Sequence, residues 1–296
     1  MRKNSHTYYM RTLVKIGTAL TLLCSLLLFS WSSPIREYPR QSLSASAENR
    51  PTEQTHSQAQ KNVYSSRALW NTDDVDISMV DPNRKLISFT FDDAPASMLD
   101  SIVAAFLQFN RSHKSAPASA TIFCNGMRIH PSTKPSVELA LAAGFELGNH
   151  TQNHKDLSRL SAQEIGTEIE KTDRLLSRFD GKAIHLLRPP YGNITDGVKL
   201  KAQAPIVSWF IDTQDWTGIP PEEIYNRVWQ GKHSGAIVLM HDGYPNTVSA
   251  LKRLLPDLYD AGYQVVSVSQ MAKAHGCKMY AGGVYTRARK PSDIHK

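Results

Sequence analysis

The sequence predicts an α/β fold in which seven parallel strands alternate with helices and form a complete or partial barrel. Two observations support this prediction. From residue 85 onward, short apolar runs alternate with segments that have the 3.6-residue period of amphipathic helices. Polar side chains suited to catalysis follow five of the apolar runs, and in βα barrels such residues lie at the carboxyl ends of the strands. Regular alternation of strand and helix favours a parallel sheet with helices packed outside it.

Each predicted element has a local reason. Apolar runs predict strands at 86–91, 119–124, 145–148, 184–187, 205–211, 236–240 and 263–268. Helical periodicity predicts helices at 97–110, 136–143, 161–178, 196–203, 221–230 and 247–261. Ser161 and Glu164 have the spacing of a capping box at the start of the 161–178 helix. Gly144 and Gly262 each follow a helix, where a left-handed residue commonly ends it.

Both ends of the chain differ from this central region. Residues 12–31 are mostly apolar, with basic residues before them and no acidic residue until Glu37, which is typical of a secretory signal peptide or an uncleaved signal anchor. The next segment is rich in Ser, Gln, Glu and Pro and has no sustained period, as flexible linkers do. The predicted organisation is a signal or anchor at 1–33, a linker at 34–81, a folded domain at 82–275 and a basic tail at 276–296. We expect the protein to be exported and to act in the cell envelope, either anchored in the membrane or secreted.

The net charge of +7 is concentrated at the two ends. Four positive charges precede residue 16 and a net five follow residue 272, which leaves the segment between them at −2. This balance argues against a nucleic-acid partner for the folded domain. The basic tail is either a solvated end or an anchor to anionic wall polymers or lipid head groups. Three cysteines are too few for a disulfide framework, although a bridge between Cys124 and Cys277 is conceivable in an oxidising compartment.

The first predicted strand ends in two adjacent carboxylates. Phe89 and Phe91 lie in an apolar, β-branched run of the kind that is buried on both faces. If the strand continues, the side chains of Asp92 and Asp93 point in opposite directions. One of them can then bind a metal while the other faces a substrate. The alternative is that this pair only caps the next helix.

Two histidines follow the third predicted strand. His150 and His154 are four residues apart, which places both rings on one face of a helical turn or a tight loop. One aspartate and two histidines supply three ligands, and this number leaves a coordination position open for water or substrate. Taken alone, both rings could equally be solvated side chains on a polar loop.

Three more motifs end predicted strands, and these are Arg188-Pro189-Pro190-Tyr191-Gly192, Asp212-Thr213-Gln214-Asp215-Trp216 and Leu239-Met240-His241-Asp242. With the two motifs above, they stand in the order of the polysaccharide deacetylase family of carbohydrate esterases, the NodB homology domain. The chain resembles this family over about residues 82–272. The resemblance implies a distorted (β/α)7 barrel. It also implies hydrolysis of the N-acetyl group of an N-acetylated sugar polymer, usually with zinc.

The resemblance implies a role for each matching residue. The metal ligands would be Asp93, His150 and His154, with Asp92 as general base and His241 as general acid. Zinc also suits this donor set on chemical grounds, because mixed carboxylate and imidazole ligands with an open position are typical of catalytic zinc, and Co²⁺ is an alternative.

Two residues would support the proton transfers. By the same resemblance, Asp215 would orient and charge His241, and Arg188 would pair with Asp92 and keep it ionised. Without the motif, Arg188 would equally suit a salt bridge at the end of a barrel strand.

Three further residues would contact the substrate. The backbone N–H of Tyr191 corresponds to an oxyanion donor, and Trp216 and Leu239 would line the slot for the acetyl methyl group. The chain departs from the family at Ala94, where glycine is usual. If that position requires a positive φ, alanine costs about 1 kcal/mol.

These observations favour a metal-dependent polysaccharide deacetylase, with peptidoglycan N-acetylglucosamine as its expected glycan partner. Chitin oligosaccharides, a biofilm polysaccharide and O-acetylated xylan are alternatives with the same chemistry. A different class of function is an inactive carbohydrate-binding protein on the same barrel. The motifs argue against that class because no ligand, base or acid is missing. The sequence gives no indication of the oligomeric state.

Overall fold

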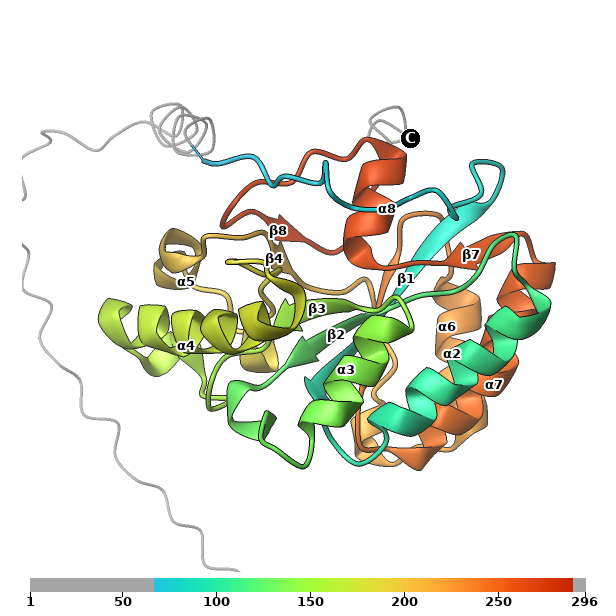
Figure 1. The fold of residues 1–296 in the computed structure, drawn as a ribbon, viewed down its shortest axis with the longest axis horizontal. Helices are drawn as coiled ribbons and strands as arrows, with labels where there is room; N and C mark the ends of the chain where they lie inside the picture. The colour runs from blue at the N-terminus through green and yellow to red at the C-terminus, as the bar shows by residue number, and fades with distance from the viewer. Residues whose placement is uncertain (1–66, 290–296) are drawn as a thin grey trace, which may run out of the picture. The chain divides into compact units, whose positions relative to one another are not determined.

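The computed structural model describes residues 67–289 (Figure 1). The predicted signal or anchor at 1–33 lies outside the described residues, as does most of the predicted linker. Within residues 67–289, none of the helices has the length and apolar character needed to cross a membrane.

A parallel sheet forms the centre of the molecule. In spatial order its strands are β3 (Glu146–Asn149), β2 (Thr121–Cys124), β1 (Lys85–Ala94), β6 (Ile237–His241) and β5 (Ile211–Asp212), and β7 (Tyr263–Val265) pairs with the start of β1. All of these pairings are parallel. The predicted α/β class with a parallel sheet is therefore confirmed.

The sheet curves toward closure through short, irregular strands. Leu187 forms parallel bridges to Asn149 on one side and to Ile206 on the other. Ile206 belongs to β4 (Ile206–Val207), which pairs with β8 (Val284–Tyr285). The strand expected at 184–187 is thus reduced to bridges, and the strand expected at 205–211 is split between β4 and β5. The split at 205–211 has a physical reason, because the backbone carbonyls of Val207 and Ser208 accept hydrogen bonds from the buried side chain of Arg188.

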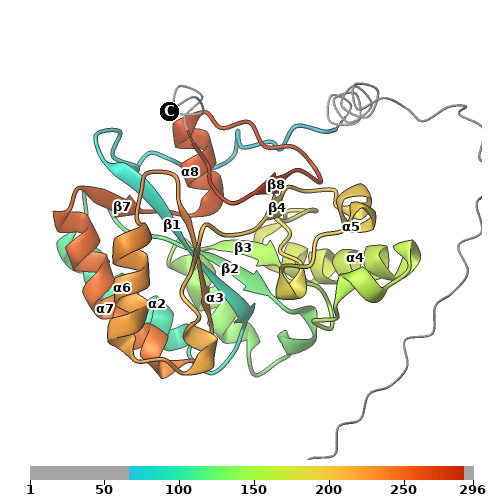
Figure 2. The same cartoon turned by 180° about the vertical axis from the view of Figure 1, so that it is seen from behind.

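Helices cover the outside of the strands. They are α2 (Leu99–Ser112), α3 (Lys134–Ala142), α4 (Ala162–Asp180), α5 (Asp196–Lys201), α6 (Pro221–Gly231), α7 (Pro245–Asp260) and α8 (Val268–His275). Figures 1 and 2 show α2, α6 and α7 grouped beside β1, with α4 and α5 at the β3 end of the sheet. The predicted capping box of α4 is confirmed, since Ser161 and Glu164 bond to each other's backbone N–H groups. The strand expected at 263–268 is too long, because Ser267 caps α8 instead.

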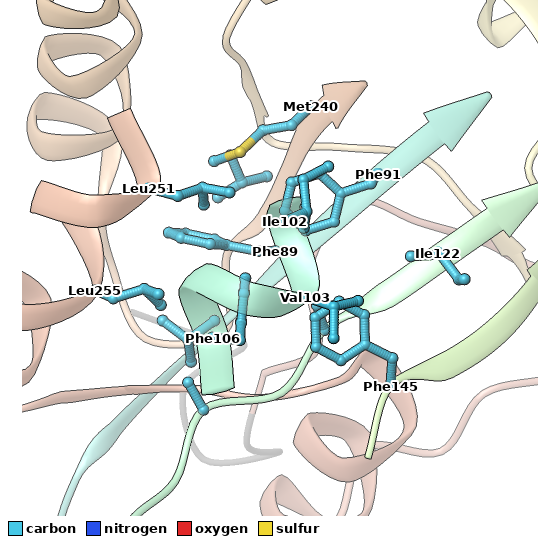
Figure 3. Packing of buried hydrophobic residues seen from close by; sticks show 14 of the residues in the cluster. Phe89, Phe91, Ile102, Val103, Phe106, Ile122, Phe145, Met240, Leu251 and Leu255 are labelled. Atoms are coloured by element: carbon cyan, nitrogen blue, oxygen red, sulfur yellow. The ribbon is translucent and has the colours of Figure 1, made fainter. Parts of the chain in front are cut away.

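The main core fixes the position of β1. Phe89 and Phe91 are fully buried and pack against side chains of α2 and α7 (Figure 3). Phe106 of α2 meets Phe91 edge to face at a centroid distance of 6.3 Å and meets Phe145 at 4.9 Å. Because β1 is held on both faces, its carboxyl end is a rigid support for the two aspartates.

Two segments that the sequence assigned to the linker and the tail are packed on the folded unit. Residues 67–81 run beside the C-terminal segment, where the backbone N–H of Trp70 donates to the carbonyl of Met279 at 2.8 Å. Residues 276–289 include β8 and the fully buried Ala288. Cys124 and Cys277 are free thiols, so the bridge considered between them is not formed.

Candidate active site and metal centre

Three side chains meet at the carboxyl ends of β1 and β3. The potential ligand atoms of Asp93, His150 and His154 all lie within 4.8 Å of one another. The Nε2 atom of His154 is 3.4 Å from Oδ1 of Asp93, and that of His150 is 4.0 Å from the same oxygen. One carboxylate and two imidazoles at this spacing fit a single divalent ion of the zinc type with a position left open.

The environment of His150 prepares it for metal binding. Its Nδ1 atom lies 2.7 Å from the carbonyl oxygen of Arg188. Because a carbonyl can only accept, Nδ1 carries the proton and Nε2 presents its lone pair toward Asp93. Burial lowers the pKa of His150 although nearby aspartates oppose the shift. The ring is therefore neutral, which is the form that binds metals.

Asp92 pairs with Arg188. The Nη1 atom of Arg188 donates to Oδ1 of Asp92 at 2.7 Å and to the hydroxyl of Thr90 at 2.7 Å. Burial opposes ionisation of Asp92, but the charge of Arg188 and the hydrogen bond from it lower the pKa of Asp92 overall. The second carboxylate oxygen, Oδ2, lies 3.7 Å from Nε2 of His150. Asp92 is thus an ionised carboxylate beside the metal centre with one oxygen not engaged by Arg188.

His241 lies at the end of β6, directly across from Asp92 in the strand register. Its Nδ1 atom is 2.7 Å from Oδ1 of the fully buried Asp215. The other oxygen of Asp215 accepts from the His241 backbone N–H at 2.8 Å and from Thr247 at 2.6 Å. Burial opposes the charged imidazole, but the hydrogen bond to Asp215 and the charges of Asp92 and Asp215 raise the pKa of His241. The pair is suited to donating a proton.

Comparison with known proteins identifies the family. A family model described as polysaccharide deacetylase matches residues 79–206. The chain is 35% identical over 199 residues to a peptidoglycan-N-acetylglucosamine deacetylase of Bacillus cereus, covering 64% of this chain and 90% of that protein. This chain belongs to the polysaccharide deacetylase family.

Other members of the polysaccharide deacetylase family match a smaller part of their own length. The peptidoglycan-N-acetylmuramic acid deacetylase PdaC of Bacillus subtilis is 33% identical over 192 residues, which is 65% of this chain and 40% of PdaC. The chain thus spans about two fifths of PdaC. A solved structure described as a T48 deacetylase with substrate superposes with a TM-score of 0.63 at 28% identity, covering 70% of this chain and 99% of that one.

The three residues expected to contact substrate differ in exposure. Tyr191 has a left-handed backbone (φ 61°), and its ring meets the His154 ring edge to face at 4.9 Å. Trp216 is 54% exposed, which is unusual for a large aromatic side chain and favours a cleft over a core position. Leu239 is buried at the end of β6. All three lie at the strand ends that carry the family's motifs.

The turn after Asp92 and Asp93 shows neither a positive φ at Ala94 nor a helix cap formed by the two aspartates. Positive φ occurs at Asp93 (65°) and not at Ala94, so the alanine is not in a left-handed conformation. The capping role considered for the Asp92-Asp93 pair is filled by Asp242, which accepts from the backbone N–H groups of Ala96 and Met98 at 2.5 and 2.9 Å. Asp242 directly follows β6, so only the tertiary fold brings it there.

A buried carboxylate that the sequence analysis missed holds the histidine loop. Glu168 of α4 is 5% exposed. Its Oε2 accepts from the backbone N–H of Asn153 at 2.8 Å, and its Oε1 accepts from the Asn153 side chain at 2.8 Å. Asn153 precedes the predicted ligand His154, whose backbone is left-handed (φ 52°). The available signal was an acidic residue next to Ile169 on the apolar face of an amphipathic helix.

Removing the Glu168 carboxylate is expected to weaken metal binding. In Glu168→Ala, the two Asn153 donors lose their acceptor, so the loop no longer holds His154 in place. Groups that orient metal ligands typically contribute about 10- to 100-fold in affinity, and we expect the zinc dissociation constant to rise by about tenfold. Glu168→Gln should recover part of the loss. Glu170→Ala, on the exposed face of the same helix, is the control in the zinc titration. A folded Glu168→Ala protein with unchanged zinc affinity would contradict this role.

A second buried cluster lies behind the same loop. Nδ1 and Nε2 of His185 are 3.0 Å from Asp173 and 3.1 Å from Asp180. Burial opposes the charge, but the hydrogen bonds to the two aspartates raise the pKa of His185. Asp173 also accepts from the side chain of Asn149, the residue before the predicted ligand His150.

The charged His185 is expected to make stability depend on pH. Because its pKa is raised on folding, its contribution is fully present below about pH 6.5 and is lost as the pH rises through the raised value. The free energy of unfolding in urea, measured on metal-free protein from pH 6 to pH 9, should therefore fall more in the parent than in His185→Gln. Parallel curves for the two proteins would refute a charged His185.

Proposed function

We propose that this protein is a metal-dependent deacetylase that hydrolyses the N-acetyl group of an N-acetylated polysaccharide, most favourably peptidoglycan N-acetylglucosamine. The observation that carries the proposal is the cluster of Asp93, His150 and His154, with Asp92, whose pKa is lowered, and His241, whose pKa is raised, beside it. Deacetylation needs a group that polarises the acetyl carbonyl, a base that takes a proton from water and an acid that protonates the leaving amine. The metal cluster, Asp92 and His241 are suited to these three tasks.

A divalent ion held by Asp93, His150 and His154 would polarise the acetamide carbonyl and lower the pKa of a nearby water. Asp92 accepts a proton from the attacking water as the new C–O bond forms. His241 donates a proton to the amide nitrogen as the C–N bond breaks. The products are acetate and a sugar with a free amine.

Other residues set the protonation states of Asp92 and His241 and position the substrate. Arg188 keeps Asp92 ionised, and Asp215 keeps His241 protonated and fixes its ring. The backbone N–H of Tyr191 is proposed to donate to the carbonyl oxygen as it gains negative charge. Trp216 and Leu239 are proposed to line the space for the acetyl methyl group. Zinc is the proposed ion, and cobalt is an alternative that the same donors would accept.

The choice of substrate rests on the named relatives. The Bacillus cereus relative is named for peptidoglycan N-acetylglucosamine and PdaC for N-acetylmuramic acid. The apolar run at 12–31 favours export to the cell envelope, where both sugars occur. We therefore place the activity at the cell wall, with the protein secreted or held at the membrane by its N-terminal segment.

A substrate panel tests the proposal. Acetate release by the zinc-loaded full chain is measured on purified peptidoglycan, chitin oligosaccharides and acetylated xylan, with total amine formation as a second readout. We expect acetate and amine in equal amounts, with peptidoglycan the preferred polymer. Acetate without amine, from xylan alone, would reject the N-deacetylase in favour of an esterase. No acetate from any polymer would favour the inactive carbohydrate-binding protein.

A further inference from the structure

A cavity of about 560 Å³ opens beside the metal centre. Its lining residues are His154, Lys155, Asp156, Arg159, Leu160 and Tyr191. His154 and Tyr191 also belong to the proposed active site. A polymer whose acetamide group reaches the metal centre therefore places a neighbouring sugar at this cavity. Its volume is in the range that holds a small ligand or one sugar unit.

Lys155 and Arg159 line this cavity, and most of their hydrogen-bond donors have no acceptor among residues 67–289. The side chain of Arg159 is 84% exposed, and only its Nε is paired, at 3.4 Å from Oδ2 of Asp156. Among residues 67–289, no acceptor bonds to the two terminal nitrogens of Arg159 or to the ammonium of Lys155. Lys155 interacts electrostatically with Glu164. The Glu164 carboxylate itself accepts hydrogen bonds from the backbone N–H and the hydroxyl of Ser161.

The one acidic residue of the cavity is occupied by its own loop. Oδ1 of Asp156 accepts from the backbone N–H and the hydroxyl of Ser158 at 3.0 and 2.7 Å, which caps the short turn Leu157–Arg159. These hydrogen bonds lower the pKa of Asp156, so it is a carboxylate at neutral pH. With two cations and one anion, the cavity carries a net positive charge of one, and the free donors belong to the cations.

We propose that this cavity binds a carboxylate carried by the sugar next to the one that is deacetylated, so that the enzyme prefers an acidic glycan. A guanidinium edge binds a carboxylate through two parallel hydrogen bonds, and an ammonium adds a point charge. Tyr191 and Leu160 supply apolar surface for the sugar ring. The inference rests on the proposed function and names its substrate class. In peptidoglycan, such a carboxylate is present on the lactyl ether of muramic acid, or in an attached peptide.

Charge reversal at the cavity tests the preference. The measurement is the ratio of kcat/KM for acetate release from peptide-free peptidoglycan oligosaccharides to that from chitin oligosaccharides of equal length. Lys155→Glu and Arg159→Glu should each lower this ratio about tenfold, because each replaces a charged hydrogen-bond donor by a repelling carboxylate. Lys252→Glu makes the same charge change at an exposed position of α7, a helix at the other end of the folded unit from α4 (Figure 1), and should leave the ratio unchanged.

A variant that is expected to raise the ratio distinguishes loss of the carboxylate site from misfolding, because misfolding would not raise it. Asp156→Asn keeps an acceptor for Ser158 but removes the negative charge that engages Arg159. The ratio should then rise by about threefold or more. Oligosaccharides that retain their peptides distinguish the two sources of the carboxylate, since a lactyl carboxylate is blocked by the peptide and a peptide carboxylate is not.

The outcomes separate this inference from the proposed function. Equal changes on acidic and neutral glycans, or no change in Lys155→Glu and Arg159→Glu, would overturn the carboxylate site while the deacetylase stands. If the parent releases no acetate from any glycan, the proposed function fails. Calorimetric binding of the peptidoglycan and chitin oligosaccharides then tests whether the cavity binds a carboxylate. Tighter binding of the acidic glycan that Arg159→Glu abolishes would still support it, and equal binding of both would reject it.

Discussion

Asp92→Asn is expected to reduce acetate release by about 10³-fold, within the range typical of a lost general base. The substitution is nearly isosteric, and its Oδ1 can still accept from Nη1 of Arg188, which is 2.7 Å from the native oxygen. An amide cannot take the proton of the attacking water at neutral pH. The loss should therefore appear in kcat, with the fold and the metal centre intact.

Metal content measured together with activity separates the two aspartates. Asp92→Asn should bind one zinc per chain with nearly the parent affinity, because Asp93 supplies the carboxylate of the cluster. Asp93→Asn is the matched variant, and it should lose both zinc and activity. If Asp92→Asn lost zinc to the same degree, Asp92 would be a ligand and its assignment as the base would be wrong.

Asp215→Asn is expected to lower the rate by about 10²- to 10⁴-fold and to change its pH dependence. Asp215 raises the pKa of His241 against the opposing effect of burial. A general acid must be protonated, so activity falls as the pH rises through its pKa. Without the Asp215 charge the imidazolium is less stable, the pKa of His241 falls, and the alkaline limb of the rate profile moves to lower pH.

The pH profile of kcat distinguishes this effect from simple loss of structure. Asp212→Asn is the control, because Asp212 is only half-buried and bonds to the Gln214 backbone rather than to His241. It should retain the parent profile. An alkaline limb that stays in place in Asp215→Asn, with only its height reduced, would mean that His241 is not the acid.

The central strand and the pair of histidines could be predicted because their information is local, whereas the choice of Asp93 as their partner came from the resemblance to the family. The run containing Phe89 and Phe91 marks a strand buried on both faces. The four-residue spacing of His150 and His154 brings their rings together once the loop is tight. Both features depend on neighbours in the sequence, and the structure has the cluster as expected.

The supports of the site could not be predicted from local pattern. Glu168 acts on a residue 15 positions away, and Asp242 caps a helix start 146 and 144 positions away. Each is an ordinary acidic residue until the fold buries it beside unpaired backbone N–H groups. The early end of the strand at 206–207 was missed for a related reason, because the carbonyls of Val207 and Ser208 accept hydrogen bonds from the Arg188 side chain.

Metal-dependent acetate release from peptidoglycan tests the account most directly. The full chain is stripped with a chelator, zinc is added back in steps, and acetate release is measured at each step beside the amount of bound zinc. The account predicts no release from the stripped protein and a rate that rises in proportion to zinc, reaching its maximum at one ion per chain. Release that persists without metal, or one bound zinc with no release, would contradict it.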